Sequence, residues 1–417
     1  MNVPSRSRFR ARGERAARSP RVWPLYAGGF LGPYAGTMVT PILHEVAGGL
    51  DTTPETTAAA VTAYMVPYAA LLLVSGTWSE RWGRRRTMRL SLLFFILASA
   101  LCALAPTIGT FLAGRVLQGA TNAFTTPLLV AAISDLTPRE RLGRALGLFA
   151  ALQAAGQTSS PLISGLSAAV DWRLAFVFPS AVALALALLP PSEAVAARRA
   201  TGRASWRVLA NRQLAAASAL SFLCYLPAIA LTVLTVLRAD EQFGLGPAGR
   251  GLVSAAFGVA GLLSASALGR GLDRLGARRL GIALFVLLAA GLLTAALGPS
   301  LPLLLCGVLL AGVAVPGLRN TVNALAAGSA PSNRAGATSL ALSAQFFGGA
   351  LAPVLCVPLY VAHGDPAFAA AALVPAVAVV LLFGLRSLGA EQVQPSPDGA
   401  RVVPRSDESG VGFPHRE

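Results

Sequence analysis

The chain has 417 residues, of which 54% are hydrophobic and only 12% are charged. Soluble domains carry about 25% charged residues, so this composition excludes an ordinary water-facing surface and indicates a lipid bilayer as a second solvent. The net charge of +16 does not indicate nucleic-acid binding, because the basic residues are all arginines placed between apolar runs, with no binding module beside them.

The first apolar run, residues 22–46, follows an arginine-rich N-terminal tail, residues 1–21. It is long enough to span a bilayer, which needs about 20 apolar residues, and too long for the apolar region of a signal peptide. Eleven further apolar runs follow, and with the first they predict an all-α integral membrane protein with twelve transmembrane helices: 57–79, 88–106, 107–134, 145–168, 173–190, 213–238, 248–270, 279–298, 301–327, 336–361 and 366–386.

The arginines gather in alternate loops. If the N-terminus lies in the cytoplasm, most of them fall on the cytoplasmic side, while the opposite loops carry Arg173, Arg238 and Arg250 beside several carboxylates. By the positive-inside rule, this asymmetry predicts an even number of spans, with both termini in the cytoplasm and the protein in the inner or plasma membrane.

The longest polar break inside the chain divides the predicted helices six and six. We expect an N-terminal six-helix bundle at 22–190, a cytoplasmic linker at 191–212 and a C-terminal six-helix bundle at 213–386. The tail at 387–417 is polar and without periodicity, so we expect it to be disordered in the cytoplasm.

Four single cysteines lie inside apolar runs, which predicts buried apolar side chains rather than a disulfide or metal site. The cysteines are Cys102, Cys224, Cys306 and Cys356. Because no nucleophile elbow, H-E-x-x-H or phosphate-binding loop is present, we expect no enzyme activity, no metal and no cofactor.

A loop motif occurs once in each half of the chain. Residues 76–85 and 269–278 both read G-x-x-x-[DE]-R-x-G-x-R, and each copy follows the second predicted helix of its half. The same offset of 193 residues separates Arg141 from Arg334, and an offset of 192 separates Pro161 from Pro353. The repeat indicates two pseudo-symmetric halves, as in secondary transporters with a substrate site between them.

The first copy of the motif predicts an ion-pair latch, with glycines for a tight turn at the membrane face and a carboxylate among arginines. Its residues are Gly76, Glu80, Arg81, Gly83, Arg84 and Arg85, with Asp135 at the end of the fourth helix as a further partner. The second copy has Ala277 in place of an arginine, so we expect a weaker latch there. Its residues are Gly269, Asp273, Arg274 and Gly276.

Two helices carry further motifs. Arg115 and Gln118 in the fourth helix lie in R-x-x-Q-G, where an intramembrane arginine costs about 2.5–3.5 kcal/mol and is functional by default. The alternative is an arginine that extends to the outer interface.

The fifth helix has small residues around a proline, in the pattern G-x8-G-x3-S-P-x2-S-G. Its positions are Gly147, Gly156, Pro161 and Gly165.

With these motifs, the sequence over residues 22–386 resembles a twelve-helix drug:proton antiporter of the major facilitator superfamily. The resemblance implies a monomer that works by alternating access, with the latch securing one conformation, and with Arg115 and Gln118 in proton coupling. Two departures from the family pattern are Glu80 where aspartate is usual, and Ser160 and Ser164 where the fifth helix usually has glycines.

The resemblance also implies a central cavity lined by the first, fourth, seventh and tenth helices, with contributions from their neighbours. The candidates are Tyr34, Asn122, Gln153, Tyr225, Asn320 and Gln345, with Tyr64, Tyr68, Gln157, Asn323 and Arg319 as further polar or aromatic side chains. For each of them, a hydrogen bond between helices is the alternative. The set is mostly neutral, which favours a lipophilic organic substrate.

The coupling carboxylate is the weakest part of the pattern, because no Asp or Glu lies at mid-membrane. Glu45, beside His44 near the outer end of the first helix, is the candidate. Proton-coupled efflux of lipophilic drug-like compounds is therefore the leading hypothesis. A facilitator or importer of a small metabolite and a membrane sensor without transport are the alternatives.

Overall fold

The structure is a computed structural model that describes residues 23–188, 206–298 and 300–384, and these residues contain helices and no strands. The N-terminal tail, most of the predicted linker and the C-terminal tail lie outside the described residues. The α-helices are α2 (Trp23–Thr37), α3 (Leu43–Gly49), α4 (Pro54–Trp82), α5 (Arg84–Ala103), α6 (Ile108–Leu136), α7 (Arg139–Ala168), α8 (Val177–Leu188), α9 (Arg212–Glu241), α10 (Pro247–Ala296), α11 (Leu301–Ser329), α12 (Arg334–His363) and α13 (Pro366–Gly384). Short 3-10 helices are η1 (Thr40–Ile42), η2 (Trp172–Phe176), η4 (Trp206–Leu209) and η5 (Pro331–Asn333).

Several long helices begin at a polar residue that satisfies free backbone N–H groups. The Thr53 side chain accepts a hydrogen bond from the Thr56 N–H, and Thr107 forms a capping box with Thr110. Asn211 accepts from the Leu214 N–H at the start of α9. In an apolar solvent these caps replace hydrogen bonds to water, so they fix where each helix begins.

Among the described residues, eight helices are long and apolar enough to cross a membrane. They are α4, α5, α6, α9, α10, α11, α12 and α13. Helix α7 is not among them, and α2 and α8 are shorter. The all-helical membrane class is confirmed, while the number of twelve spans stays a prediction.

Helix α10 is bent back on itself at Gly276. At 50 residues it would be about 75 Å long if straight, more than twice the thickness of the hydrocarbon core. Gly276 breaks it with φ 73°, and Gly83 in the first copy of the loop motif has φ 88°. Both positions need glycine, because other residues rarely adopt this backbone conformation. Gly76, by contrast, lies inside α4, so the predicted tight turn belongs to Gly83 alone.

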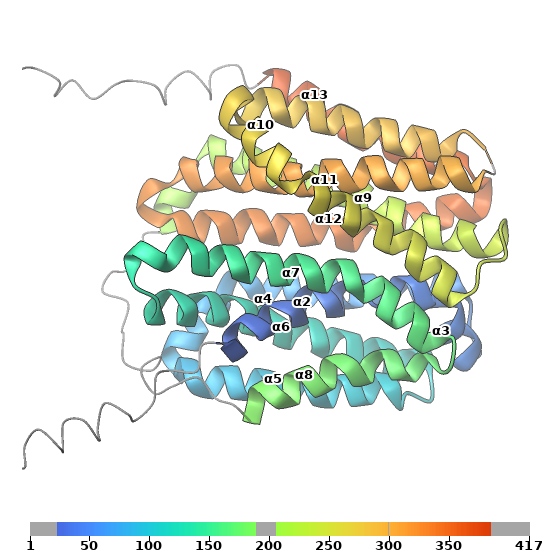
Figure 1. The fold of residues 1–417 in the computed structure, drawn as a ribbon, viewed down its shortest axis with the longest axis horizontal. Coiled ribbons are helices and arrows are strands. Elements are labelled where there is room, and N and C mark those ends of the chain that lie inside the picture. Colours follow the sequence, from blue (N-terminus) through green and yellow to red (C-terminus); the bar gives the residue numbers. More distant parts are fainter. Residues whose placement is uncertain (1–22, 189–205, 299, 385–417) are drawn as a thin grey trace, which may run out of the picture.

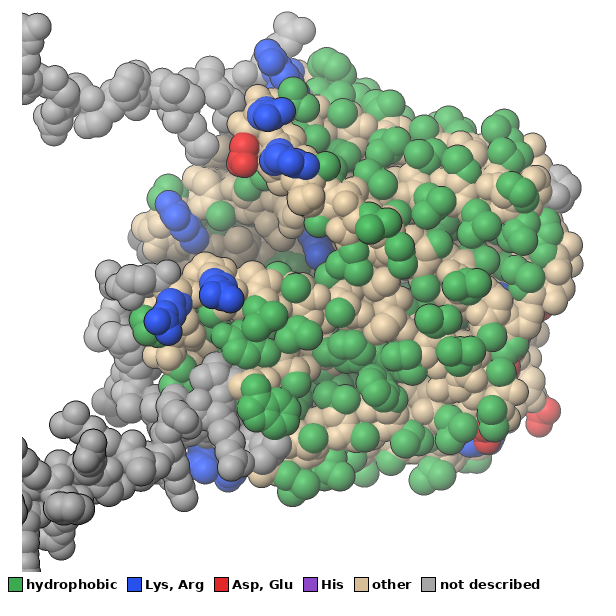
Figure 2. Space-filling model, viewed as in Figure 1, with side chains coloured by type: hydrophobic (Ala, Val, Ile, Leu, Met, Phe, Trp, Pro, Cys, Tyr) green, Lys and Arg blue, Asp and Glu red, His purple; other side chains and the backbone are tan. Residues whose placement is uncertain are grey.

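The helices from α2 to α8 gather on one side of the molecule and those from α9 to α13 on the other (Figure 1). Basic side chains gather at one end of the molecule, with one acidic side chain among them, and the other visible acidic side chains lie toward the opposite end (Figure 2). We call these the arginine-rich end and the acidic end. Helix α4 runs from the acidic end at Pro54 to the arginine-rich end at Trp82.

Candidate functional site

Near the acidic end, α7 and α10 are in direct backbone contact. A Cβ atom on Gly165 would lie 2.4 Å from the Pro247 carbonyl oxygen, and one on Gly251 would lie 2.4 Å from the Pro161 carbonyl oxygen. A Cβ on Gly258 would lie 2.4 Å from the Thr158 side chain. Small residues therefore let these two helices approach closely.

Helices α4 and α12 join the two sides of the molecule in a similar way. Thr62 donates a hydrogen bond of 2.6 Å to the Ala350 carbonyl, and Ser343 donates one of 2.7 Å to the Ala69 carbonyl. The Tyr68 and Phe346 rings meet edge to face, with centroids 4.5 Å apart. Together with α7 and α10, this pair closes the molecule between its centre and the acidic end.

The arginine-rich end is open between the two sides. A Cβ atom on Gly76, Gly147 or Gly269 would meet nothing within 4 Å, in contrast to one on Gly165, Gly251 or Gly258. Figure 2 shows a hollow there, with basic side chains along its rim and one in its depth. The predicted small-residue helix α7 therefore has two different parts: Gly156, Pro161 and Gly165 pack against other helices, whereas Gly147 does not.

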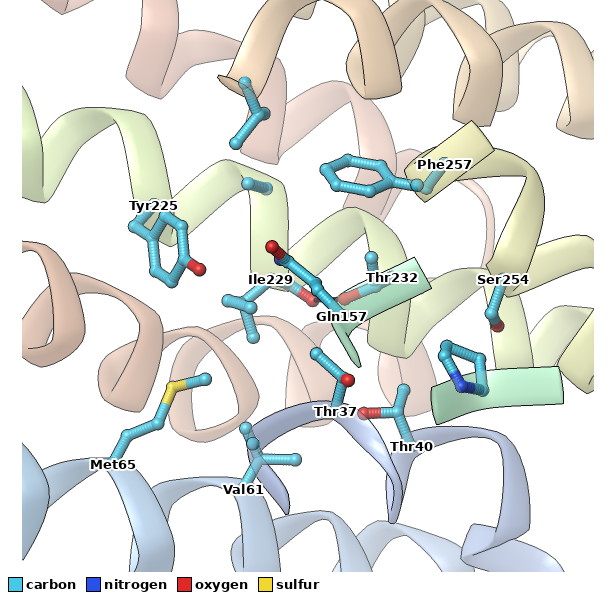
Figure 3. Close-up of a pocket in the computed structure, with 15 residues that line it drawn as sticks. Thr37, Thr40, Val61, Met65, Gln157, Tyr225, Ile229, Thr232, Ser254 and Phe257 are labelled. Carbon is cyan, nitrogen blue, oxygen red and sulfur yellow. Dashed lines mark hydrogen bonds between the residues drawn. The ribbon is translucent and has the colours of Figure 1, made fainter. Parts of the chain in front are cut away.

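A pocket lies between the two sides of the molecule (Figure 3), with about 600 Å³ of space not filled by atoms, including space open to solvent. Its walls come from α2, η1, α4 and α7 on one side and from α9, α10 and α11 on the other. All fifteen lining residues are uncharged. They are Gly36, Thr37, Thr40, Val61, Met65, Gln157, Pro161, Tyr225, Ala228, Ile229, Thr232, Ser254, Phe257, Gly258 and Val315.

Of the six cavity residues predicted from the sequence, only Tyr225 lines this pocket. Gln345 is buried and interacts with the Tyr225 hydroxyl, as does Gln157. Gln153 is half-buried and Asn320 is exposed, and neither is part of the pocket wall.

Tyr34 and Asn122 lie inside the first half of the molecule instead. The Tyr34 ring is fully buried and packs against Phe30 and Phe178, with centroids 5.4 Å and 5.3 Å away. The Asn122 amide donates a 2.7 Å hydrogen bond to the Tyr64 hydroxyl. Asn122 therefore forms a hydrogen bond between helices, whereas the buried Tyr34 hydroxyl has no hydrogen-bond partner and the ring contributes packing only. The threonines and Ser254 that line the pocket could not be predicted from the sequence, because such residues are also common in helices that pack against one another.

Arg115 is fully buried, which excludes the alternative that it extends to an interface. Its guanidinium donates hydrogen bonds to the Ala35 carbonyl at 3.1 Å, to the Ala60 carbonyl at 3.3 Å and to Gln118 Oε1 at 2.7 Å. It also lies 4.5 Å from the centre of the Tyr64 ring.

The network continues through Gln118, whose amide donates a 2.8 Å hydrogen bond to Ser99 Oγ. Arg115 thus links α6 to α2 and α4, and Gln118 links it to α5. The guanidinium has one nitrogen, Nη2, without a hydrogen-bond partner. Since no described carboxylate pairs with Arg115, its charge is held by dipoles and by the Tyr64 ring alone.

The first loop motif forms part of the predicted latch. Arg84 donates a 2.7 Å hydrogen bond to Asp135 Oδ2, which joins the start of α5 to the end of α6. Arg81 lies in the last turn of α4, and Arg85 follows Arg84 at the start of α5. The Glu80 side chain lies outside the described part of the structure.

The second copy forms a different contact. Asp273 and Arg274 are exposed and form no ion pair with any described residue. Arg278, the last residue of the motif, donates hydrogen bonds to the carbonyls of Leu382 and Phe383, at 3.0 Å and 3.3 Å. It therefore binds the end of α13 rather than a carboxylate.

Glu45 belongs to an ion cluster that joins the two halves of the chain at the acidic end. Its carboxylate is bonded to the guanidinium of Arg250, a buried residue of α10. Arg250 also bonds to Asp240 Oδ1 at 2.6 Å, and His44 Nε2 lies 3.0 Å from Asp240 Oδ2. The sequence indicates Glu45 and His44 but contains no signal for their partners, which are about 200 residues away.

A second buried arginine lies near this cluster. Arg238 is fully buried and bonds to Asp365 at 3.1 Å, to Gln242 at 2.8 Å and to the Ala295 carbonyl. It holds together the ends of α9 and α10 and the turn before α13. The sequence predicts a loop position for Arg238, because it lies at the end of an apolar run, whereas the structure places it in the last turn of α9.

The arrangement of helices has a counterpart among known proteins. A profile of the Major Facilitator Superfamily matches residues 25–353 and, in a second match, residues 218–408. The chain belongs to the Major Facilitator Superfamily. It is therefore a membrane transporter, and the functional class that its motifs predicted is confirmed.

Two superfamily relatives are drug-resistance proteins by name. A 157-residue stretch is 36% identical to the puromycin resistance protein pur8 of Streptomyces alboniger, and covers 37% of this chain and 31% of that protein. A 152-residue stretch is 29% identical to Multidrug resistance protein 1 of Bacillus subtilis, and covers 36% and 39%. These matches span only about a third of the relatives' length.

Two solved superfamily structures share the fold over most of this chain. The nucleoside transporter NupG aligns with a TM-score of 0.67 at 16% identity, over 88% of this chain and 98% of that one. The human organic anion transporter MFSD10 (TETRAN) aligns with a TM-score of 0.64 at 19% identity, over 87% and 98%. At these identities the likeness concerns the fold alone.

Proposed function

We propose that this superfamily member is a secondary active transporter that exports lipophilic drug-like compounds in exchange for protons. The observation that carries the proposal is the uncharged pocket between the two halves, where apolar walls formed by Met65, Ile229 and Phe257 alternate with single hydroxyls and one amide. Such a wall binds lipophilic molecules by burial of apolar area and orients them with a few polar contacts.

The proposed transport cycle is alternating access between two pseudo-symmetric bundles of six helices, residues 22–190 and 213–386. The linker at 191–212 and both tails lie in the cytoplasm, in agreement with arginines that gather at one end (Figure 2). In this arrangement the hollow opens to the cytoplasm, and the contacts of α7 with α10 and of α4 with α12 close the outer side.

Protons are coupled through two sites in this proposal. Glu45 accepts the proton at the outer end, where neutralising its carboxylate removes the bond to Arg250 and loosens the two halves. Arg115 and Gln118 hold α2, α4, α5 and α6 as one body while this happens. The support is that Glu45 connects the halves directly, as a group that couples protonation to opening has to do.

The two loop motifs act at the other end of the same cycle. The Arg84 and Asp135 ion pair, with Gly83 in the turn, secures the cytoplasmic end of the first bundle. Arg81, Arg85 and Glu80 complete the latch in this proposal. The second copy, with Gly269, Asp273, Arg274 and Gly276, is the weaker latch.

A facilitator or importer of a small metabolite is the second candidate. The observation that favours it is that no carboxylate is among the residues lining the pocket. A sensor without transport has no observation in its favour.

Everted membrane vesicles with an imposed pH gradient separate these candidates. We expect dyes and antibiotics to accumulate in the vesicles only while the gradient lasts, and Glu45→Gln to abolish this accumulation. Movement that is equally fast without a gradient would support the facilitator and contradict proton coupling.

A further inference from the structure

Arg319 of α11 is a half-buried arginine that has no hydrogen bond or ion pair with any described residue. It lies four residues after Val315, which lines the pocket, so the two side chains project from the same face of α11. The hollow at the arginine-rich end has basic side chains along its rim and one in its depth (Figure 2). Arg319 thus places a cation one helical turn from the pocket wall.

The other arginines in the interior of the helices have partners in the protein. Arg115 bonds to two carbonyls and Gln118, Arg238 to Asp365, and Arg250 to Glu45 and Asp240. Burial of an unpaired charge is costly, and an ionisable residue within a membrane usually has a partner or a function. Arg319 differs from these three arginines because no described residue forms a hydrogen bond or an ion pair with its guanidinium.

The surroundings of Arg319 favour a negative ligand. Tyr225 and the two amides that interact with its hydroxyl, Gln157 and Gln345, are neutral, and all fifteen residues lining the pocket are uncharged. No described carboxylate therefore opposes an anion that enters the pocket. A lipophilic cation would meet the uncompensated guanidinium and no counter-charge.

We propose that Arg319 is an anion-binding subsite of the transport path, and that it holds the carboxylate or sulfonate of an otherwise lipophilic organic substrate. The apolar body of the substrate then lies against Ile229 and Phe257, with Tyr225 between the two parts. The proposal rests on the transport function above and narrows its substrate class to amphiphilic organic anions. A guanidinium suits this role, because it donates two parallel hydrogen bonds to one carboxylate or sulfonate.

The test compares two dyes that share the xanthene ring system but differ in charge: fluorescein, an anion at neutral pH, and rhodamine 123, a cation. Binding to the purified full-length chain is measured by fluorescence anisotropy. We expect the unaltered protein to bind fluorescein more tightly than rhodamine 123. Arg319→Gln should weaken fluorescein binding by about tenfold or more and leave rhodamine 123 binding unchanged or tighter, while Arg319→Lys keeps most of the preference for the anion.

The matched control is Arg334→Gln, which removes one positive charge from an exposed position at the start of α12. It should leave both affinities unchanged, and equal thermal unfolding of all variants would exclude a folding defect. The subsite would be overturned if the unaltered protein bound the two dyes equally. It would also be overturned if Arg334→Gln lost as much fluorescein binding as Arg319→Gln. Dye accumulation in everted vesicles tests the proposed function independently of the subsite. If fluorescein binds but does not move with the pH gradient, the proposed function is contradicted and the subsite is still supported.

Discussion

Arg115 shows at the scale of one residue how a charge is kept inside a membrane helix. No carboxylate among the described residues neutralises it, and two carbonyls, one amide and one ring share the charge instead. The motif R-x-x-Q-G predicted its importance and its neighbour Gln118. The carbonyls of Ala35 and Ala60 could not be predicted, because they depend on how α2 and α4 pack against α6.

Arg115→Gln tests this network. The variant loses the charge-assisted hydrogen bonds to the carbonyls of Ala35 and Ala60, each worth about 1.5–3 kcal/mol. We expect a lower unfolding temperature in detergent and a loss of about tenfold or more in gradient-driven transport. Arg212→Gln, which removes an exposed arginine at the start of α9, is the control and should change neither quantity.

A pair of glycines from one motif gives opposite predictions. Gly83 has φ 88°, so Gly83→Ala forces an unfavourable backbone conformation and should destabilise the protein by about 1–3 kcal/mol. Gly76 lies in the helix α4 with open space at its Cβ position, so Gly76→Ala should stabilise it by about 0.5–1 kcal/mol. Chemical denaturation in micelles measures both, and equal effects would show that the turn does not depend on Gly83.

At the scale of helices, the sequence predicts which segments are helical better than which face each helix turns to the cavity. The predicted limits of the apolar runs agree with α4, α5, α6 and α11 to within a few residues, because apolar length decides them. The prediction that Tyr34 and Asn122 line the cavity rests only on which helix each belongs to. Both point into the first half, since the rotation of α2 and α6 is set by packing that spans the whole bundle.

The contact between α7 and α10 provides a test at this scale. Gly165→Ala places a methyl group against the Pro247 carbonyl and must separate the helices near the acidic end, whereas Gly147→Ala meets open space. We expect the first variant to lose about 1–3 kcal/mol of stability and to bind its substrate with changed affinity. Access from the outer side is measured with a single cysteine in place of Thr40, in a chain without other cysteines. This cysteine should react faster with an impermeant maleimide in Gly165→Ala than in the parent.

In the control Gly147→Ala, both stability and the labelling rate of the Thr40 cysteine should remain as in the parent. If Gly165→Ala leaves labelling unchanged while it lowers stability, the contact contributes to packing and does not close the outer path.

For the whole molecule, the important contacts are those between the two halves. The internal repeat predicts that two similar units exist, but it contains no information on how they meet. Glu45 and Arg250 are 205 positions apart, and their bond exists only because α3 and α10 come together at the acidic end. A residue whose partner lies in the other half looks like a solvated charge at a helix end until both halves are placed.

Glu45→Gln tests whether this bond closes the outer end. The groups facing Glu45 are Arg250 on α10, Asp240 on α9 and His44 beside it, with Glu55 of α4 close to His44. Loss of the carboxylate removes the bond between Glu45 and Arg250, while Arg250 keeps its bond to Asp240 and His44 keeps its contact with Asp240. Spin labels at cysteines replacing Thr56 and Leu297, one in each half, should therefore show a larger population of long distances across the acidic end.

Alternating access makes a second demand on the same variant. A label pair at Leu148 and Leu275, toward the arginine-rich end, should show shorter distances as the outer pair lengthens, because one rocking motion moves both ends. Acid should shift the unaltered protein in the same direction, since protonation of Glu45 also removes its charge, and Glu45→Gln should lose most of this response. His44→Gln is the control for the imidazole and should retain it. Lengthening at both ends together would show general loosening and would contradict a gate at Glu45.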